Sequence, residues 1–107
     1  MQTSPDRTIA ARELAYTRIG DSVKLGVTIC INEPFRLTEG SVDFPFAEGA
    51  AGCVIRFEGL PEKDMTVYGA DTLQALAIAV DTVDKYLRIL SKKYAFFFKT
   101  GEPYFED

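Results

Sequence analysis

The sequence contains no histidine among its 107 residues, and this absence limits the chemistry available to the chain. Ser-His-Asp and Cys-His catalytic arrangements are excluded, as are most zinc sites. Glycine-rich phosphate loops and the calcium-loop spacing of carboxylates are also missing. Lys99-Thr100-Gly101 matches one fragment of the serine β-lactamase motifs, but no S-x-x-K precedes it, so we interpret it as a hairpin turn. We therefore expect that the protein is not an enzyme and that it binds neither a cofactor nor a metal.

Cysteine is scarce, since the chain has only Cys30 and Cys53. By strand alternation Cys30 falls on the wet face of one expected strand and Cys53 on the buried face of another, so their Cβ atoms should point apart. Neither thiol has a histidine or a further cysteine nearby to make a redox or metal site. We expect two free thiols.

Long apolar runs are absent as well. Residues 1–7 carry no run of signal-peptide length, and the longest run elsewhere, residues 75–80, is far too short to cross a bilayer. We expect a cytoplasmic protein without membrane contact. With 47% hydrophobic and 26% charged residues, the composition is typical of one globular domain, residues 1–107.

The formal net charge of −4 is unevenly distributed along the chain. Residues 33–71 hold eight acidic and three basic residues, a net charge of −5. This acidic middle argues against a nucleic-acid partner, because phosphate binding needs clustered lysine and arginine. It is compatible with a basic protein partner. The alternative interpretation is that these acids are solvated loop charges that keep the protein in solution.

Two stretches near the amino terminus are typical of β-strands. Residues 8–19 alternate imperfectly and are followed by a turn at Gly20-Asp21. Residues 23–32 alternate cleanly, with five apolar side chains on one face: Val23, Leu25, Val27, Ile29 and Ile31. Together they predict a long antiparallel hairpin. Two more strands are predicted at residues 52–58 and 65–69.

A long amphipathic helix is predicted over residues 72–91. Asp71 is a suitable N-cap, and Gln74 three residues later completes a capping box. Apolar residues at three- and four-residue spacing predict the buried stripe, which consists of Leu73, Leu76, Ala77, Val80, Val83, Leu87 and Leu90. We predict an α+β fold, a mainly antiparallel β-sheet with one long α-helix packed on one face and a C-terminal β-hairpin.

Residues 33–52 contain prolines and glycines that interrupt both periodicities, which predicts a loop around one short strand at residues 43–46. Its two phenylalanines either reach the core or form an exposed apolar patch. From this loop and the link at residues 59–64 we select the partner-binding candidates Glu39, Asp43, Phe44, Phe46, Glu48, Glu62 and Asp64. The aromatic residues of the carboxyl-terminal segment are an alternative contact surface.

Four segments of the chain resemble a known family. They are residues 9–14 (Ile-Ala-Ala-Arg-Glu-Leu), 27–29 (Val-Thr-Ile), 43–46 (Asp-Phe-Pro-Phe) and 68–76 (Tyr-Gly-Ala-Asp-Thr-Leu-Gln-Ala-Leu). The family consists of small bacterial proteins of unknown function, and several members are taken to be immunity proteins of interbacterial toxins. The resemblance implies an immunity-like function and assigns no functional residue.

Two functions from different classes follow. The first is an immunity-like inhibitory binding protein that neutralises a cognate bacterial toxin by direct protein-protein contact. The toxin would be the basic partner, with a basic domain. The alternative is a small ligand-binding or carboxylate-based enzymatic domain, whose sign would be a pocket lined by converging carboxylates with perturbed pKa values.

Overall fold

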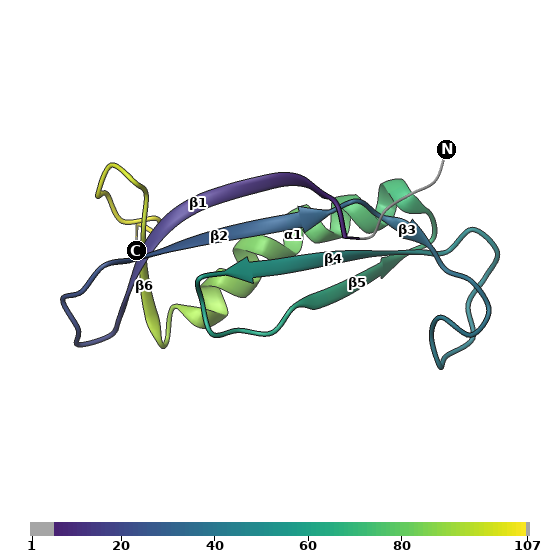
Figure 1. The fold of residues 1–107 in the computed structure, drawn as a ribbon, viewed down its shortest axis with the longest axis horizontal. Helices are drawn as coiled ribbons and strands as arrows, with labels where there is room; N and C mark the ends of the chain where they lie inside the picture. Colours follow the sequence, from purple (N-terminus) through teal and green to yellow (C-terminus); the bar gives the residue numbers. More distant parts are fainter. Residues whose placement is uncertain (1–5, 107) are drawn as a thin grey trace.

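The computed structural model describes residues 6–106 and has the α+β architecture predicted from the sequence. The molecule is elongated, 48 × 25 × 22 Å, and Figure 1 shows most of the strands along its long axis, the last strand across that axis, and one helix behind the sheet. No helix in residues 6–106 combines the length and the apolar character needed to cross a membrane. The elements in chain order are β1 (Thr8–Arg18), β2 (Leu25–Asn32), β3 (Phe35–Arg36), β4 (Ala51–Glu58), β5 (Met65–Gly69), α1 (Thr72–Leu90) and β6 (Tyr94–Phe97).

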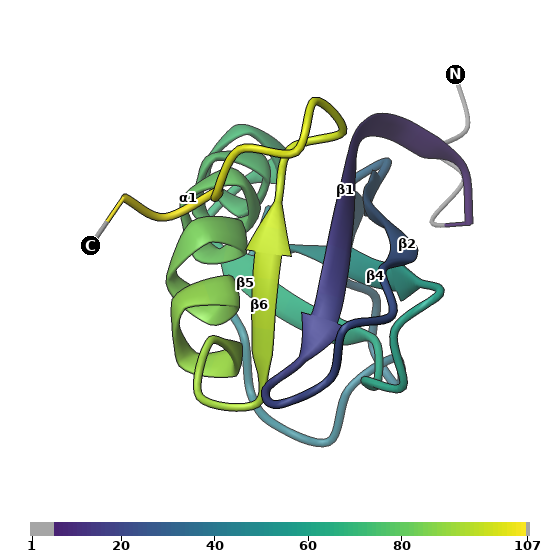
Figure 2. The same ribbon diagram turned by 90° about the vertical axis from the view of Figure 1, so that its left-hand side faces the viewer.

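Every strand pair in the sheet is antiparallel. β1 and β2 form the predicted long hairpin, in which Ala10 lies opposite Ile31 and Tyr16 opposite Leu25. β4 pairs with β2 through its carboxyl-terminal half and with the short β3 through its first residues, while β5 occupies its other side. β6 pairs with the outer edge of β1. In Figure 2, β6 stands between β1 and α1.

The core lies between the sheet and α1, where alternate strand residues and one helix face meet. Its largest fully buried members come from β2, β4 and α1, and they are Ile29, Ile55, Cys53 and Leu87. Each large aliphatic side chain buried here stabilises the fold by roughly 1.5–3 kcal/mol. Val23 and Leu25, which were predicted on the buried face of β2, are instead exposed, because they lie at or before the start of β2, beyond its pairing with β4.

The helix begins at the predicted cap. The Gln74 amide donates to Asp71 Oδ1 at 2.7 Å, and Gln74 Oε1 accepts from the Ala70 amide at 2.6 Å. The capping box is therefore confirmed, except that the Gln74 side chain accepts from the amide of Ala70, the residue before the N-cap, and not from that of Asp71 itself. These two bonds satisfy amides at the start of the helix that have no partner within it.

The buried face of α1 differs from the predicted stripe in its first half. The predicted burial of Leu73, Ala77 and Val80 is wrong, since all three are exposed. In this half the helix instead buries small residues against β4 and β5, and their small size allows the helix and strand backbones to approach closely. Part of the apolar stripe therefore faces away from the sheet. The buried residues of α1 are Ala75, Ala79, Val83, Leu87 and Leu90.

The predicted exposure of Cys30 is also wrong, because only 3% of this residue is accessible. It lies on the sheet face away from α1, opposite Arg56 in the register of β2 and β4. The Arg56 guanidinium donates to Asn32 Oδ1 at 3.2 Å and to Thr8 Oγ1 at 2.8 Å, so polar side chains bridge three strands over this face. Cys30 and Cys53 are both free, as predicted.

Two further expectations need correction. Residues 43–46 form no strand, and the short strand of this region is β3, because the chain stays extended after Pro34 and pairs with Gly52 and Ala51. The returning arm of the C-terminal hairpin is reduced to a single bridge between Phe97 and Pro103. A proline in that arm lacks the amide needed for a longer ladder.

Candidate functional site

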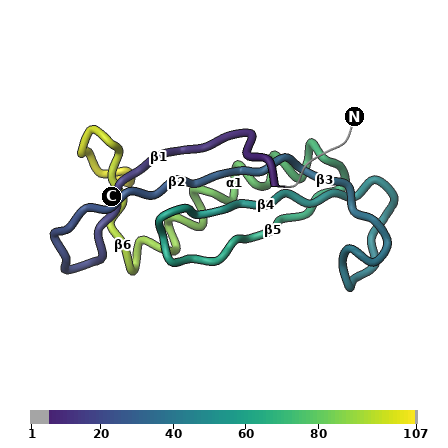
Figure 3. The backbone as a smooth tube through the Cα atoms, in the orientation of Figure 1, coloured from purple at the N-terminus to yellow at the C-terminus, as the bar shows by residue number. Residues whose placement is uncertain are grey.

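The acidic loop, residues 37–50, forms one end of the long axis of the molecule (Figure 3). The two ends of the loop are joined by a hydrogen bond from the Leu37 amide to the Ala50 carbonyl at 2.8 Å. Within it, the Ser41 hydroxyl donates to the Thr38 carbonyl at 2.6 Å and accepts from the Thr38 amide at 3.1 Å. A loop of this length with joined ends and internal bonds is a compact Ω-loop, a type that is frequently functional.

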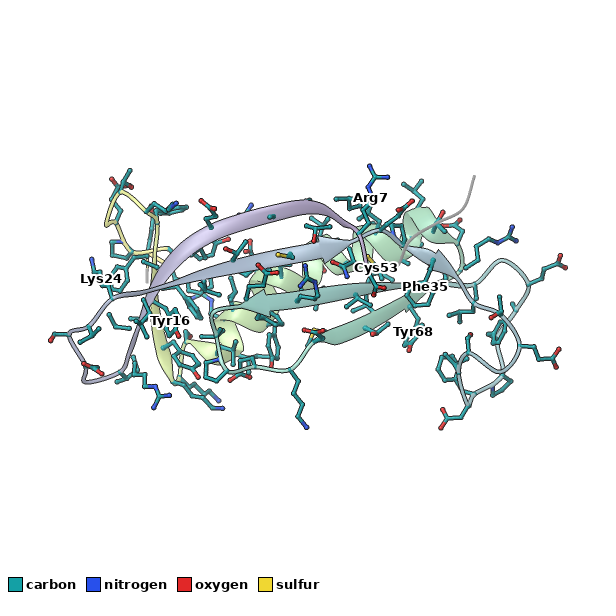
Figure 4. The ribbon with its side chains drawn as sticks, viewed as in Figure 1. Arg7, Tyr16, Lys24, Phe35, Cys53 and Tyr68 are labelled. Carbon is teal, nitrogen blue, oxygen red and sulfur yellow. The ribbon has the colours of Figure 1, made fainter. Side chains whose placement is uncertain are left out.

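Aromatic packing attaches the loop to the sheet. The Phe44 ring meets the Tyr68 ring edge to face, with centroids 5.1 Å apart. Figure 4 labels Tyr68 on β5, beside the loop, and Phe35 on β3 close by. Phe44 nevertheless remains 40% exposed, whereas Phe46 is half-buried. The loop thus presents one large apolar side chain to solvent on a supported base.

Exposed carboxylates lie in the same loop as that aromatic side chain. Glu39, Asp43 and Glu48 are all exposed. A hollow of about 730 Å³ opens on this end, lined by Arg36, Glu39, Phe44, Phe46 and Glu48 among others. Two of these lining residues are acidic and one, Arg36, is basic, and the net negative charge suits a cationic partner surface and accelerates its association.

The remaining two candidates lie elsewhere. Glu62 and Asp64 belong to the turn between β4 and β5, at the opposite end of β4, which is roughly 25 Å long at the usual rise of a strand. Glu62 accepts a bond from the Tyr86 hydroxyl at 3.1 Å and lies 3.8 Å from Lys93 Nζ. Burial, then the bond to Glu62, raises the pKa of Tyr86. Glu62 therefore ties the turn to α1, and only Asp64 projects into solvent.

A separate polar and aromatic cluster joins the carboxyl-terminal segment to α1. Asp84 accepts a bond from the Tyr104 hydroxyl and lies 3.4 Å from Arg12 of β1. The Arg88 guanidinium lies over the Phe105 ring, 4.1 Å from its centroid. Burial, then the bond to Asp84, raises the pKa of Tyr104. These aromatic residues mainly fasten the chain end, and Phe98 alone is left substantially exposed.

Sequence reasoning missed one feature, an apolar hollow of about 160 Å³ between the sheet and α1, lined by Ala10, Ala11, Arg12, Ile29, Ile31, Val80 and Val83. The signal was present in the helix, where apolar residues cover a wider arc than one contact with a sheet requires. Among the described residues, no group of three or more His, Cys, Asp or Glu side chains is placed to hold a metal ion.

Comparisons of the chain with protein-family models, with curated proteins and with solved structures find no match.

Proposed function

We propose that the protein is an immunity-like binding protein that acts in the cytoplasm and neutralises a bacterial toxin by direct contact. The observation that carries the proposal is the acidic loop, which combines the exposed acids Glu39, Asp43 and Glu48 with the exposed Phe44. Long-range attraction by the acids speeds encounter with a basic surface, and a large apolar anchor slows separation. The family resemblance points to the same function.

The alternative, a ligand-binding or carboxylate-based enzymatic domain, has weaker support. Its carboxylates would have to converge in an enclosed site where burial raises their pKa values. The acids of the loop instead point into solvent around an open hollow. Glu13 has a lowered pKa, caused by its bond with Lys99, and its side chain is exposed.

The test is the association and dissociation kinetics of the protein with the product of the neighbouring gene, at low and high salt. Glu39→Lys combined with Glu48→Lys should slow association by about tenfold and weaken its salt dependence. Phe44→Ala should speed dissociation by about tenfold or more, with little change in association.

Asp64→Lys supplies the matched control, because Asp64 is an exposed acid at the other end of β4. Glu48→Lys changes the charge equally and should slow association several-fold more than Asp64→Lys does. Equal effects of the two substitutions would remove the loop from the interface. Absence of binding to the neighbouring product, or binding without loss of toxin activity, would overturn the proposed function.

A further inference from the structure

β6 covers only one half of the outer edge of β1. The pairing runs from Ala15 opposite Phe97 to Arg18 opposite Tyr94, and the chain then turns away. Within the described part of the chain, no strand pairs with residues 8–14 on this side. The outer edge of β1 is therefore unpaired beyond the end of β6, where β1 bends away from the direction of β6 (Figure 2), and we call this unpaired edge the open lane. Arg7, labelled in Figure 4, marks the far end of that lane.

Strand alternation identifies the backbone groups that face the lane. The Ile19 amide donates to the Lys93 carbonyl on the β6 side, at 3.0 Å. Successive residues of an antiparallel strand direct their backbone groups to opposite sides, and the register of β1 is unbroken from Ala10 onward. The N–H and C=O groups of Ala11 and Glu13 therefore point into the lane. An extended chain placed there has backbone partners waiting for it.

The helix supplies an apolar wall for the same lane. Asp84 lies 3.4 Å from Arg12, which shows that this face of α1 turns toward β1. Val80, about one turn earlier on that face, is 58% exposed, and Leu73 two turns before it is 75% exposed. The 160 Å³ hollow lies between Val80 and the strand residues Ala10 and Ile31. An apolar cavity of about 150 Å³ is large enough for a benzene-sized group.

The charges beside the lane are already paired. Asp81 lies 2.7 Å from Lys85, and Lys99 Nζ donates to Glu13 at 2.7 Å. Arg12 and Asp84 neutralise one another in the same way. A charged occupant would have to compete with these pairs, so the lane favours an uncharged one.

We propose that this lane binds an extended, uncharged segment of another protein, which adds as a strand beside residues 8–14 and places one apolar side chain in the hollow. The geometry is that of β-strand addition, in which the edge supplies affinity and a pocket supplies specificity. A second copy of this chain fits less well. In such a dimer the β1 strands of the two copies would pair edge to edge. The second copy could offer only its Ala10 and Arg12 to the hollow, because Leu14, the next residue on that face of the strand, is buried in its own core.

The probe is a capped, fluorescent heptapeptide of alternating valine and threonine, titrated against the intact protein and followed by anisotropy. Its control is the same peptide with alternate amides methylated, which removes the donors that would face β1. We expect saturable binding of the first peptide and at least tenfold weaker binding of the second. Equal binding of both peptides, or of neither, would overturn the proposal.

Two variants locate the site. Ala11→Pro deletes an amide that faces the lane and none that faces β2, and Val80→Asp puts a charge on the apolar wall; each should weaken peptide binding at least tenfold. Ile89→Asp is the control, because Ile89 is 61% exposed on the same helix and does not line the hollow. Thermal unfolding verifies that each variant is folded.

Sedimentation of the protein without peptide completes the test. Concentration-dependent dimers that Val80→Asp abolishes would make a second copy the occupant and overturn the proposal. The inference is independent of the acidic loop, so Val80→Asp should leave binding to the neighbouring gene product unchanged.

Discussion

The Tyr16 hydroxyl of β1 donates a hydrogen bond to the Gly59 carbonyl at 2.7 Å, joining the hairpin to the turn that follows β4. Tyr16 is 3% exposed, and its ring also meets Tyr94 edge to face at 5.4 Å. One side chain thus connects the turn after β4, strand β1 and strand β6.

Tyr16→Phe should lower the free energy of unfolding by about 1–2 kcal/mol, because the buried bond is lost and the ring stays. Urea denaturation measures the change. Tyr68→Phe is the control, since Tyr68 is exposed, and it should change stability by less than about 0.5 kcal/mol. Equal effects of the two substitutions would mean that the Tyr16 bond contributes nothing.

Gly59→Ala should destabilise the fold more than Gly40→Ala. Both glycines have positive φ, +92° and +86°, so alanine is strained at either position by roughly 1–2 kcal/mol. At Gly59 the added Cβ would also lie 2.5 Å from the Gly26 carbonyl oxygen, whereas nothing lies near it at Gly40. We expect a total cost of roughly 2–5 kcal/mol at Gly59, measured by urea denaturation. A larger loss at Gly40 would contradict the close approach of the turn to β2.

Ala79→Asp should abolish cooperative unfolding, whereas Val80→Asp should preserve it. Ala79 is fully buried against the sheet and Val80 is 58% exposed. An unpaired buried carboxylate costs several kcal/mol, against a total stability of about 5–15 kcal/mol. Circular dichroism during thermal unfolding distinguishes the two. The reverse result would show that α1 is rotated from the orientation described.

Both thiols should react slowly in the native protein. Burial raises the pKa of Cys53 and of Cys30, so less thiolate is present at pH 8 and access is poor. The stabilisation linked to each neutral thiol is fully present below the ordinary pKa of about 8.5 and is lost as pH rises through the raised value. A colorimetric thiol reagent should label both rapidly in urea and slowly without it, and reductant should leave Tm unchanged. Rapid labelling of the folded protein would contradict the burial of Cys30.

Local patterns predicted the elements well. The alternation in residues 23–32 predicted β2, and the Asp71 and Gln74 pair predicted the start of the helix. Both predictions were possible because caps and periodicity depend on residues close in sequence. The short strand in the acidic region was misplaced. Pairing of Phe35 with Gly52 depends on a long-range register that no local pattern contains.

The candidate site was only partly predictable. The charge count found the acidic loop, but it also grouped Glu62 with the loop acids. A count along the chain does not show that β4 places Glu62 at the opposite end of the sheet from the loop. The contact of Phe44 with Tyr68 likewise arises from folding, because the loop and β5 approach one another only in three dimensions.

By itself the sequence determined the α+β class, the hairpin, the helix and the absence of histidine chemistry, because these depend on composition and on spacing of a few residues. Only the tertiary structure decided which part of the apolar stripe on α1 is covered. A periodic pattern states that Val80 belongs to an apolar face, whereas its burial depends on which strands lie against that part of α1. The length of β6 is likewise set by the turn after Phe97, in a different part of the chain, and it leaves the outer edge of β1 open.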